Sequence, residues 1–161
     1  MFVTPNVVAT IRDNDISGRD TGIYTDSKIA NLHGNLVHNN TVGITSRQGV
    51  ICGTGCGWTS LDASQSNQIF ENETGIFIPQ DGIGVLIGLT DIFDNGIENL
   101  GDRPRLILNQ IHGNETGIQG TSTLGPESWE GSLFNDIYGN DVGVRTCQAR
   151  RCDSIVSTKT V

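Results

Sequence analysis

The sequence predicts an all-β solenoid, a fold in which each repeat forms one coil and neighbouring coils share a core. The first observation is a repeated pattern, NxIxxNxxGI: NQIFENETGI at residues 67–76 and NQIHGNETGI at residues 109–118 share eight of ten letters. The second is the distance between copies, about 20 to 30 residues, which is typical of repeat architectures. The third is composition, because single Ile or Val residues flanked by polar ones, with 21 Gly, favour strands and turns over helices.

The pattern returns four more times with some erosion. Three copies match closely: NDISGRDTGI at residues 14–23, NLVHNNTVGI at 35–44 and NDIYGNDVGV at 135–144. A shortened copy, TDIFDNGI at residues 90–97, lacks two residues before its Gly. The copies predict about six coils, which form a single domain over residues 1–161.

Each letter of the pattern has a physical role in a parallel β-helix, where strands of successive coils stack about 4.8 Å apart. We expect two apolar columns to form the core: Ile16, Val37, Ile69, Ile92, Ile111 and Ile137, and Ile23, Ile44, Ile76, Ile97, Ile118 and Val144. The second Asn of the pattern is expected at a turn, in the left-handed conformation, with its amide bonded from coil to coil. The Gly three residues later is expected to supply another permissive turn position.

This repeat resembles that of the right-handed parallel β-helix of the pectate-lyase-like superfamily. The superfamily includes the periplasmic accessory protein of nitrous-oxide reductase and many polysaccharide lyases, epimerases and surface proteins. The resemblance covers residues 8–146 and implies a right-handed solenoid with three strands in each coil. It says little about function, because one fold hosts many sites.

The charge of the chain argues against two classes of partner. The net charge is -8 and the isoelectric point is 4.6, so we expect neither nucleic acid nor an anionic membrane as a partner. No apolar run approaches the ~20 residues of a membrane span. Residues 1–20 also lack the basic and apolar regions of a signal peptide.

Four cysteines form two local pairs, Cys52 with Cys56 and Cys147 with Cys152. Four coils separate the two pairs, roughly 19 Å at strand spacing, whereas a disulfide needs Cα atoms within about 7 Å. We therefore expect two local disulfides, with four reduced thiols as the alternative. Disulfides favour an extracellular or periplasmic location, and a cytoplasmic location is left open.

Two insertions interrupt the repeat, at about residues 45–64 and 121–132. Each contains one of the two tryptophans, Trp58 and Trp129. Loops on a rigid scaffold often hold function, so these side chains are candidates for stacking on a sugar. The alternative is that each Trp folds its loop onto the rod.

Alternation along a strand places the fourth pattern position on the outer surface when the third points inward. That column carries a ring in five successive copies: His38, Phe70, Phe93, His112 and Tyr138. The second position runs beside it and is rich in hydrogen-bonding groups, among them Asp91 and Asp136. Such a face suits a carbohydrate, and a protein interface or plain stabilisation of the sheet are the alternatives.

An enzyme acting on polysaccharides needs an acid and a base, or calcium held by carboxylates. The acidic stretch from Asp81 to Asp102, near Arg103 and Arg105, is the candidate, but it lacks the compact catalytic signatures of the superfamily. We expect a non-catalytic binding module that presents the ring-lined face to carbohydrate or a protein partner, without a cofactor. A polysaccharide lyase or glycoside hydrolase, completed by missing coils or another subunit, is the alternative, and bound calcium is left open.

The ends of a solenoid normally need caps, because the last coil exposes unpaired backbone and core. Residues 1–10, MFVTPNVVAT, already have the composition of a strand, and no amphipathic helix precedes them. We therefore expect a homo-oligomer, most simply a two-fold dimer, that covers this open end.

Overall fold

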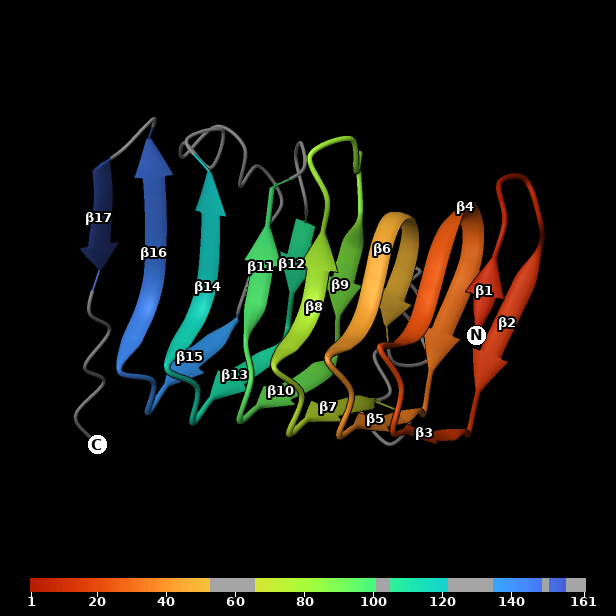
Figure 1. The fold of residues 1–161 in the computed structure, drawn as a ribbon, viewed down its shortest axis with the longest axis horizontal. Coiled ribbons are helices and arrows are strands. Elements are labelled where there is room, and N and C mark those ends of the chain that lie inside the picture. Colours follow the sequence, from red (N-terminus) through yellow and green to blue (C-terminus); the bar gives the residue numbers. More distant parts are fainter. Residues whose placement is uncertain (53–65, 101–104, 122–134, 149–150, 156–161) are drawn as a thin grey trace.

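The computed structural model describes residues 1–52, 66–100, 105–121, 135–148 and 151–155 (Figure 1). All the regular secondary structure in these residues is β-strand, and the strands form two sheets. In the described ranges, no helix is long and apolar enough to cross a membrane.

The smaller sheet is built from the first half of the repeated pattern. Its six parallel strands follow the order β3 (Asp15–Ser17), β5 (Leu36–His38), β7 (Asn67–Phe70), β10 (Thr90–Phe93), β13 (Gln110–His112) and β15 (Asp136–Tyr138). The register pairs equal pattern positions, so that Ile92 lies opposite Ile69 on one side and Ile111 on the other. The copies therefore stack one strand apart, as the repeat predicts.

The larger sheet has eleven strands and contains the second half of the pattern. Its main path runs through β1 (Phe2–Val3), β4 (Thr21–His33), β6 (Val42–Cys52), β8 (Thr74–Ile78), β11 (Ile97–Asn99), β14 (Thr116–Thr121), β16 (Val142–Gln148) and β17 (Arg151–Ile155). Three further strands join beside this path: β2 (Ala9–Arg12) on β4, β9 (Leu86–Gly88) on β6, and β12 (Arg105–Ile107) on β9. Among these described strands, every pair is parallel except β16 with β17.

Strands β4 and β6 each contribute to two parts of the larger sheet. Their first parts pair through Ile23 and Ile44, and their last parts pair through Leu32 and Ile51. Strand β8 continues the first part and β9 continues the second. The chain thus passes repeatedly from the smaller sheet through both parts of the larger one, an arrangement compatible with a β-helix solenoid (Figure 1).

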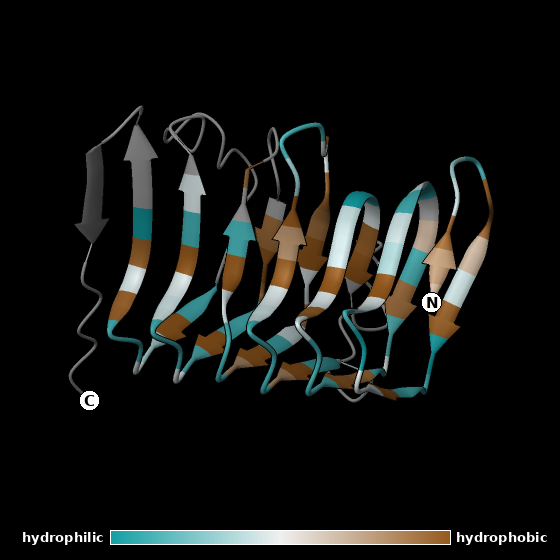
Figure 2. Cartoon of the chain, viewed as in Figure 1, coloured by the Kyte–Doolittle hydropathy of each residue, from teal (hydrophilic) through white to brown (hydrophobic). Residues whose placement is uncertain are grey.

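The core lies between the sheets and contains the two predicted apolar columns, together with buried residues from the second part of the larger sheet, such as Leu32, Ile51 and Ile87. Hydrophobic residues recur on the strands of both sheets, shown in brown in Figure 2. In the first column, Val37, Ile69, Ile92 and Ile111 are fully buried, and in the second, Ile23, Ile44, Ile76, Ile97 and Ile118 are buried. The flanking members Ile16, Ile137 and Val144 are partly buried and pack against this core. The inward orientation of both columns is confirmed.

Asparagine side chains form two ladders, one at each end of the strands of the smaller sheet. The predicted ladder is present: Asn40 Nδ2 donates to Asn72 Oδ1 at 3.0 Å, and Asn72 Nδ2 donates to Asn95 Oδ1 at 2.9 Å. A second ladder, which the sequence reasoning missed, uses the first Asn of the pattern. There Asn35 Nδ2 donates to Asn67 Oδ1 at 3.0 Å, and both residues are fully buried. The signal for it was already in the sequence, because the pattern begins with Asn.

The left-handed turn residue is the one before each Asn of the predicted ladder. The expectation that the Asn itself adopts this conformation was wrong. Its amide instead bonds the carbonyl two residues earlier, as in Asn40 Nδ2 to His38 O at 2.9 Å, which requires the intervening residue to reverse the chain. The positive φ angles are 69° at Gly18, 53° at Asn39, 51° at Glu71, 55° at Asp94, 67° at Gly113 and 62° at Gly139.

The pattern Gly is required by close approach between coils in most copies. A Cβ on Gly43 would lie 2.6 Å from the carbonyl oxygen of Gly75, and a Cβ on Gly75 would lie 2.7 Å from that of Gly96. Neither Gly43 nor Gly75 has a positive φ, so the expected conformational role is corrected to a steric one. Gly96, in the shortened copy, is the exception with φ of 116°.

The expected insertions lie mostly outside the described residues. Residues 45–52 belong to β6, so the first insertion begins later than predicted, while 53–64 and 122–132 are not described. Cys56 is also outside the described part of the chain. The backbones of Cys147 and Cys152 lie opposite each other in the antiparallel pair of β16 and β17. The cysteine side chains are not among those described, so both disulfides stay predictions.

Candidate functional site

Five rings form a continuous ladder on the smaller sheet, and they are the rings predicted from the fourth pattern position. This ring ladder is carried by β5, β7, β10, β13 and β15. Its centroid distances are 4.9 Å from His38 to Phe70, 5.0 Å from Phe70 to Phe93, 5.4 Å from Phe93 to His112 and 4.9 Å from His112 to Tyr138. Adjacent ring planes are at most 12° from parallel. The structure therefore brings all five predicted rings together.

Face-to-face stacking determines which part of each ring is accessible. Strands about 4.8 Å apart hold rings of adjacent strands in contact, so each of the three inner rings has both faces covered. All five side chains are half-buried. A molecule lying on this surface meets ring edges, and a sugar stacked flat on an inner ring would have to separate two stacked neighbours. The sugar-stacking role stays a prediction that this geometry does not favour.

A polar column runs beside the ring ladder at the second pattern position. Two of its carboxylates bond the histidines of the ladder: His38 Nε2 lies 2.8 Å from Asp15 Oδ1, and His112 Nε2 lies 3.0 Å from Asp91 Oδ1. These contacts orient both imidazole rings within the ladder. The complete column is Asp15, Leu36, Gln68, Asp91, Gln110 and Asp136, with Gln110 opposite Asp136 in the register.

The other predicted site residues are not placed in the ladder. Trp58 and Trp129 lie outside the described residues, so their role stays a prediction. The acidic stretch does not form one cluster, because Asp81 pairs with Arg47 while Asp91 lies on the smaller sheet. Asp102 and Arg103 fall outside the described part of the chain.

Arg47 is the centre of a separate ion-pair group on β6. Its guanidinium lies 3.3 Å from Asp26 Oδ2 and also pairs with Asp81. A hydrogen bond with Tyr24, followed by the two carboxylates, raises the pKa of Arg47 above its ordinary value. The group therefore stays charged at every ordinary pH and ties successive coils together.

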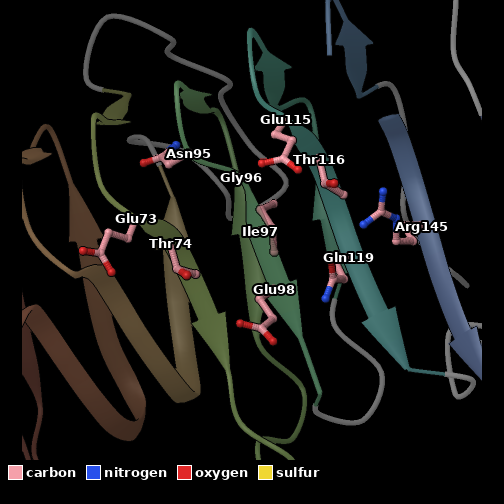
Figure 3. Close-up of a pocket in the computed structure, with 10 residues that line it drawn as sticks. All are labelled: Glu73, Thr74, Asn95, Gly96, Ile97, Glu98, Glu115, Thr116, Gln119 and Arg145. Atoms are coloured by element: carbon pink, nitrogen blue, oxygen red, sulfur yellow. The ribbon is translucent and has the colours of Figure 1, made fainter. Parts of the chain in front are cut away.

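The larger sheet carries a pocket that the sequence did not predict. It is open to solvent, has a volume of about 210 Å³ and is lined by residues of four neighbouring coils, including the charged side chains Glu73, Glu98, Glu115 and Arg145 (Figure 3). We call this pocket the notch. Its signal in the sequence is the shortened copy at residues 90–97, where two residues are missing immediately before Gly96.

The described residues give no direct indication of a metal site. Within residues 1–52, 66–100, 105–121, 135–148 and 151–155, no group of three or more His, Cys, Asp or Glu side chains is placed to hold a metal ion.

Comparison of the chain with protein-family models, curated proteins and solved structures finds no match. The ring ladder and the notch must therefore be interpreted from their own geometry.

Replacing Phe70 and Phe93 together with Ser should leave the fold intact. Both rings lie on the outer face of the smaller sheet, whereas the neighbouring Ile69 and Ile92 are buried on its inner face. Loss of three ring contacts should lower the free energy of unfolding by about 2 kcal/mol. Circular dichroism should still show strands, and a chain that no longer folds would mean that the inner and outer faces of the sheet are reversed.

Proposed function

We propose that the chain is a right-handed parallel β-helix of about six coils, related to the pectate-lyase-like superfamily, and that it is a non-catalytic binding module. The outer face of the smaller sheet is its contact surface, and the partner is a protein. One observation carries the proposal: a ladder of five half-buried rings runs along this face, bordered by a column of acceptor groups. Monomeric proteins seldom expose contiguous apolar surface of this kind, and aromatic residues are enriched at protein interfaces.

The ladder supports a protein partner over a carbohydrate because its inner ring faces are already used. A protein surface can pack on ring edges and place donors on the neighbouring carboxylates and amides, whereas a sugar gains most from a free ring face. Asp15, Gln68, Gln110 and Asp136 are exposed beside the ladder. Together with the net charge of -8, they favour a partner whose contact surface carries Lys or Arg.

A glycan array separates the two classes of partner. It should be probed with the wild-type protein and with the Phe70→Ser/Phe93→Ser double variant. We expect no neutral or acidic polysaccharide whose retention depends on these rings. A polysaccharide that the wild type retains and the double variant does not would overturn the protein proposal in favour of carbohydrate binding.

The enzyme alternative has one supporting observation, the pairing of His112 with Asp91 at 3.0 Å. A histidine oriented by a carboxylate is a common acid–base arrangement. The assay is release of unsaturated products or reducing ends from the polysaccharides of the array, with and without added calcium. Turnover that disappears in His112→Gln would replace the binding proposal with the enzyme alternative.

Self-association is proposed at the edge formed by β1 and β2. Exposed apolar side chains gather on residues 1–8, with Phe2 68% and Val8 79% exposed. Among the described strands, β1 and β2 pair with β4 alone, so their outer edges are open to another strand.

The substitution Val8→Glu should shift the protein toward monomer, because it places a charge where a second copy would pack. Light scattering over a range of concentrations is the measurement, and Ile83→Glu, at another exposed apolar position, is the matched control. A wild-type protein that is monomeric throughout, or that responds to the control alone, would contradict an interface at this edge.

A further inference from the structure

The notch arises from a defect in the repeat. In four copies, three residues separate the ladder Asn from the following core residue, as Glu115, Thr116 and Gly117 do between Asn114 and Ile118. Between Asn95 and Ile97 there is only Gly96. The two missing residues correspond to Glu and Thr in both neighbouring copies, which read NETGI.

In complete coils, these two residues continue the backbone ladder. Glu73 N–H donates to Asn40 O at 3.2 Å and Thr74 N–H donates to Thr41 O at 3.0 Å. The same bonds recur three coils further on, where Asp141 N–H donates to Asn114 O at 3.1 Å and Val142 N–H donates to Glu115 O at 2.9 Å. Each coil therefore offers two carbonyls to the next coil and two N–H groups to the previous one.

The shortened coil spans the gap without replacing those bonds. Asn95 keeps its ladder position, with its N–H donating to Asn114 Oδ1 at 2.8 Å, and Ile97 keeps its place between Ile76 and Ile118. Within the described residues, no backbone bond joins the N–H groups of Glu115 or Thr116 to the preceding coil. On the opposite wall, no described backbone N–H donates to the carbonyls of Asn72 or Glu73.

The resulting gap has the spacing of one absent strand. Its walls, Thr74 on β8 and Thr116 on β14, belong to coils two steps apart, about 9.6 Å at strand spacing. The opening of about 210 Å³ is lined by both threonines and by Gly96 (Figure 3). One wall offers N–H groups and the other offers carbonyls, which is the pattern that an extended backbone satisfies on its two sides.

The charge of the notch indicates which peptide would enter it. Glu73 and Glu115 are exposed and Glu98 is half-buried, whereas Arg145 is the single basic residue among the lining residues that the structure describes. Three carboxylates against one guanidinium favour a cationic guest. Lys or Arg side chains next to the inserted backbone would reach these glutamates.

We propose that the notch binds an extended, Lys- or Arg-bearing segment of a partner protein, two residues of which occupy the position of the missing Glu-Thr. The guest N–H groups donate to the carbonyls of Asn72 and Glu73. The carbonyl of the guest residue in the Glu position accepts from the N–H group of Thr116, as the Glu115 carbonyl does from Val142 N–H. This is strand addition within the solenoid, on a different sheet from the ring ladder, and it does not depend on the function proposed for the ladder.

The experiment fills the notch with two residues inserted into the shortened coil itself. Inserting Glu-Thr between Asn95 and Gly96 recreates NETGI, the sequence of both neighbouring coils. Fluorescence anisotropy is measured with a labelled acetyl-Thr-Lys-Thr-Lys-amide peptide and with the same peptide methylated on its backbone nitrogens. The wild type should bind the first peptide, and the insertion and the methylation should each weaken binding at least tenfold.

Two controls keep the outcomes interpretable. The insertion variant should unfold at the same denaturant concentration as the wild type or a higher one, which shows that the coil has accepted the residues. The substitution Glu98→Gln leaves the notch open, and it should weaken binding of the lysine peptide severalfold. Equal affinity of the wild type and the insertion variant, equal affinity for the methylated peptide, or no binding at millimolar peptide would overturn the proposal.

Discussion

Gly96→Ala is expected to lower the free energy of unfolding by about 4 kcal/mol, more than any other single substitution considered for this chain. A Cβ at this position would lie well inside van der Waals contact of the Thr116 carbonyl oxygen. The backbone φ of 116° is also strained for any residue with a side chain. In addition, the Gly96 carbonyl accepts from Gly75 N–H at 3.0 Å and Ile76 N–H at 3.2 Å, so displacement of this residue would disturb the coil before it.

The matched control for Gly96→Ala is Gly18→Ala. Gly18 has a φ of 69°, but a Cβ there would meet no heavy atom within 4 Å. Only the cost of the left-handed conformation remains, about 1 to 2 kcal/mol. Chemical denaturation of both variants separates backbone strain from steric overlap, and similar midpoints for the two would show that Gly96 is not compressed between coils.

Asn114→Leu is expected to lower the free energy of unfolding by about 3 kcal/mol, the next largest effect. Asn114 is 3% exposed, and its Nδ2 donates to Asn140 Oδ1 at 2.7 Å and to Ile92 O at 3.3 Å. Its Oδ1 accepts from Asn95 N–H at 2.8 Å. Leu keeps the size of the side chain but leaves buried donors and acceptors of three coils without partners.

Gln110→Leu is the matched control for Asn114→Leu, because it makes the same kind of replacement in the same coil at an exposed position. It should change the free energy of unfolding by less than about 0.5 kcal/mol. Urea denaturation followed by tryptophan fluorescence or circular dichroism gives both values. Equal midpoints for the wild type and Asn114→Leu would contradict the buried ladder.

The sequence was most informative where one residue type recurs at one position. The Ile columns and the ring ladder follow from stacking alone, because equal positions of a repeat must become neighbours once the coils are in register. The same reasoning should have revealed the second Asn ladder, since Asn35 and Asn67 occupy equal positions. The first position lies at the start of a strand, where turn geometry gives no reason for an Asn.

Other features could not be derived from the pattern. The left-handed residues occupy the fifth position, which varies among Gly, Asn, Asp and Glu, so that no single letter marks the turn. Parallel stacking of the rings, rather than an edge-to-face arrangement, depends on χ angles that a sequence does not specify. The notch could not be predicted either, because the sequence does not say how the chain accommodates the two missing residues. In the structure Asn95 and Ile97 both keep their columns, so the gap opens between coils and is not absorbed by a shift in register.

The central claim, that the outer face of the smaller sheet is the contact surface for a protein, is tested most directly by photo-crosslinking. A photoreactive amino acid is placed at Gln68 or Gln110, both exposed beside the ring ladder, and at Lys28, which is exposed on β4 of the larger sheet. After identification, the captured protein is purified, and its Kd is measured for the wild type and for Phe70→Ser/Phe93→Ser. The account predicts one common adduct from Gln68 and Gln110, none from Lys28, and a Kd raised at least tenfold in the double variant. An adduct formed equally from Lys28, or a Kd unchanged by loss of the two rings, would contradict it.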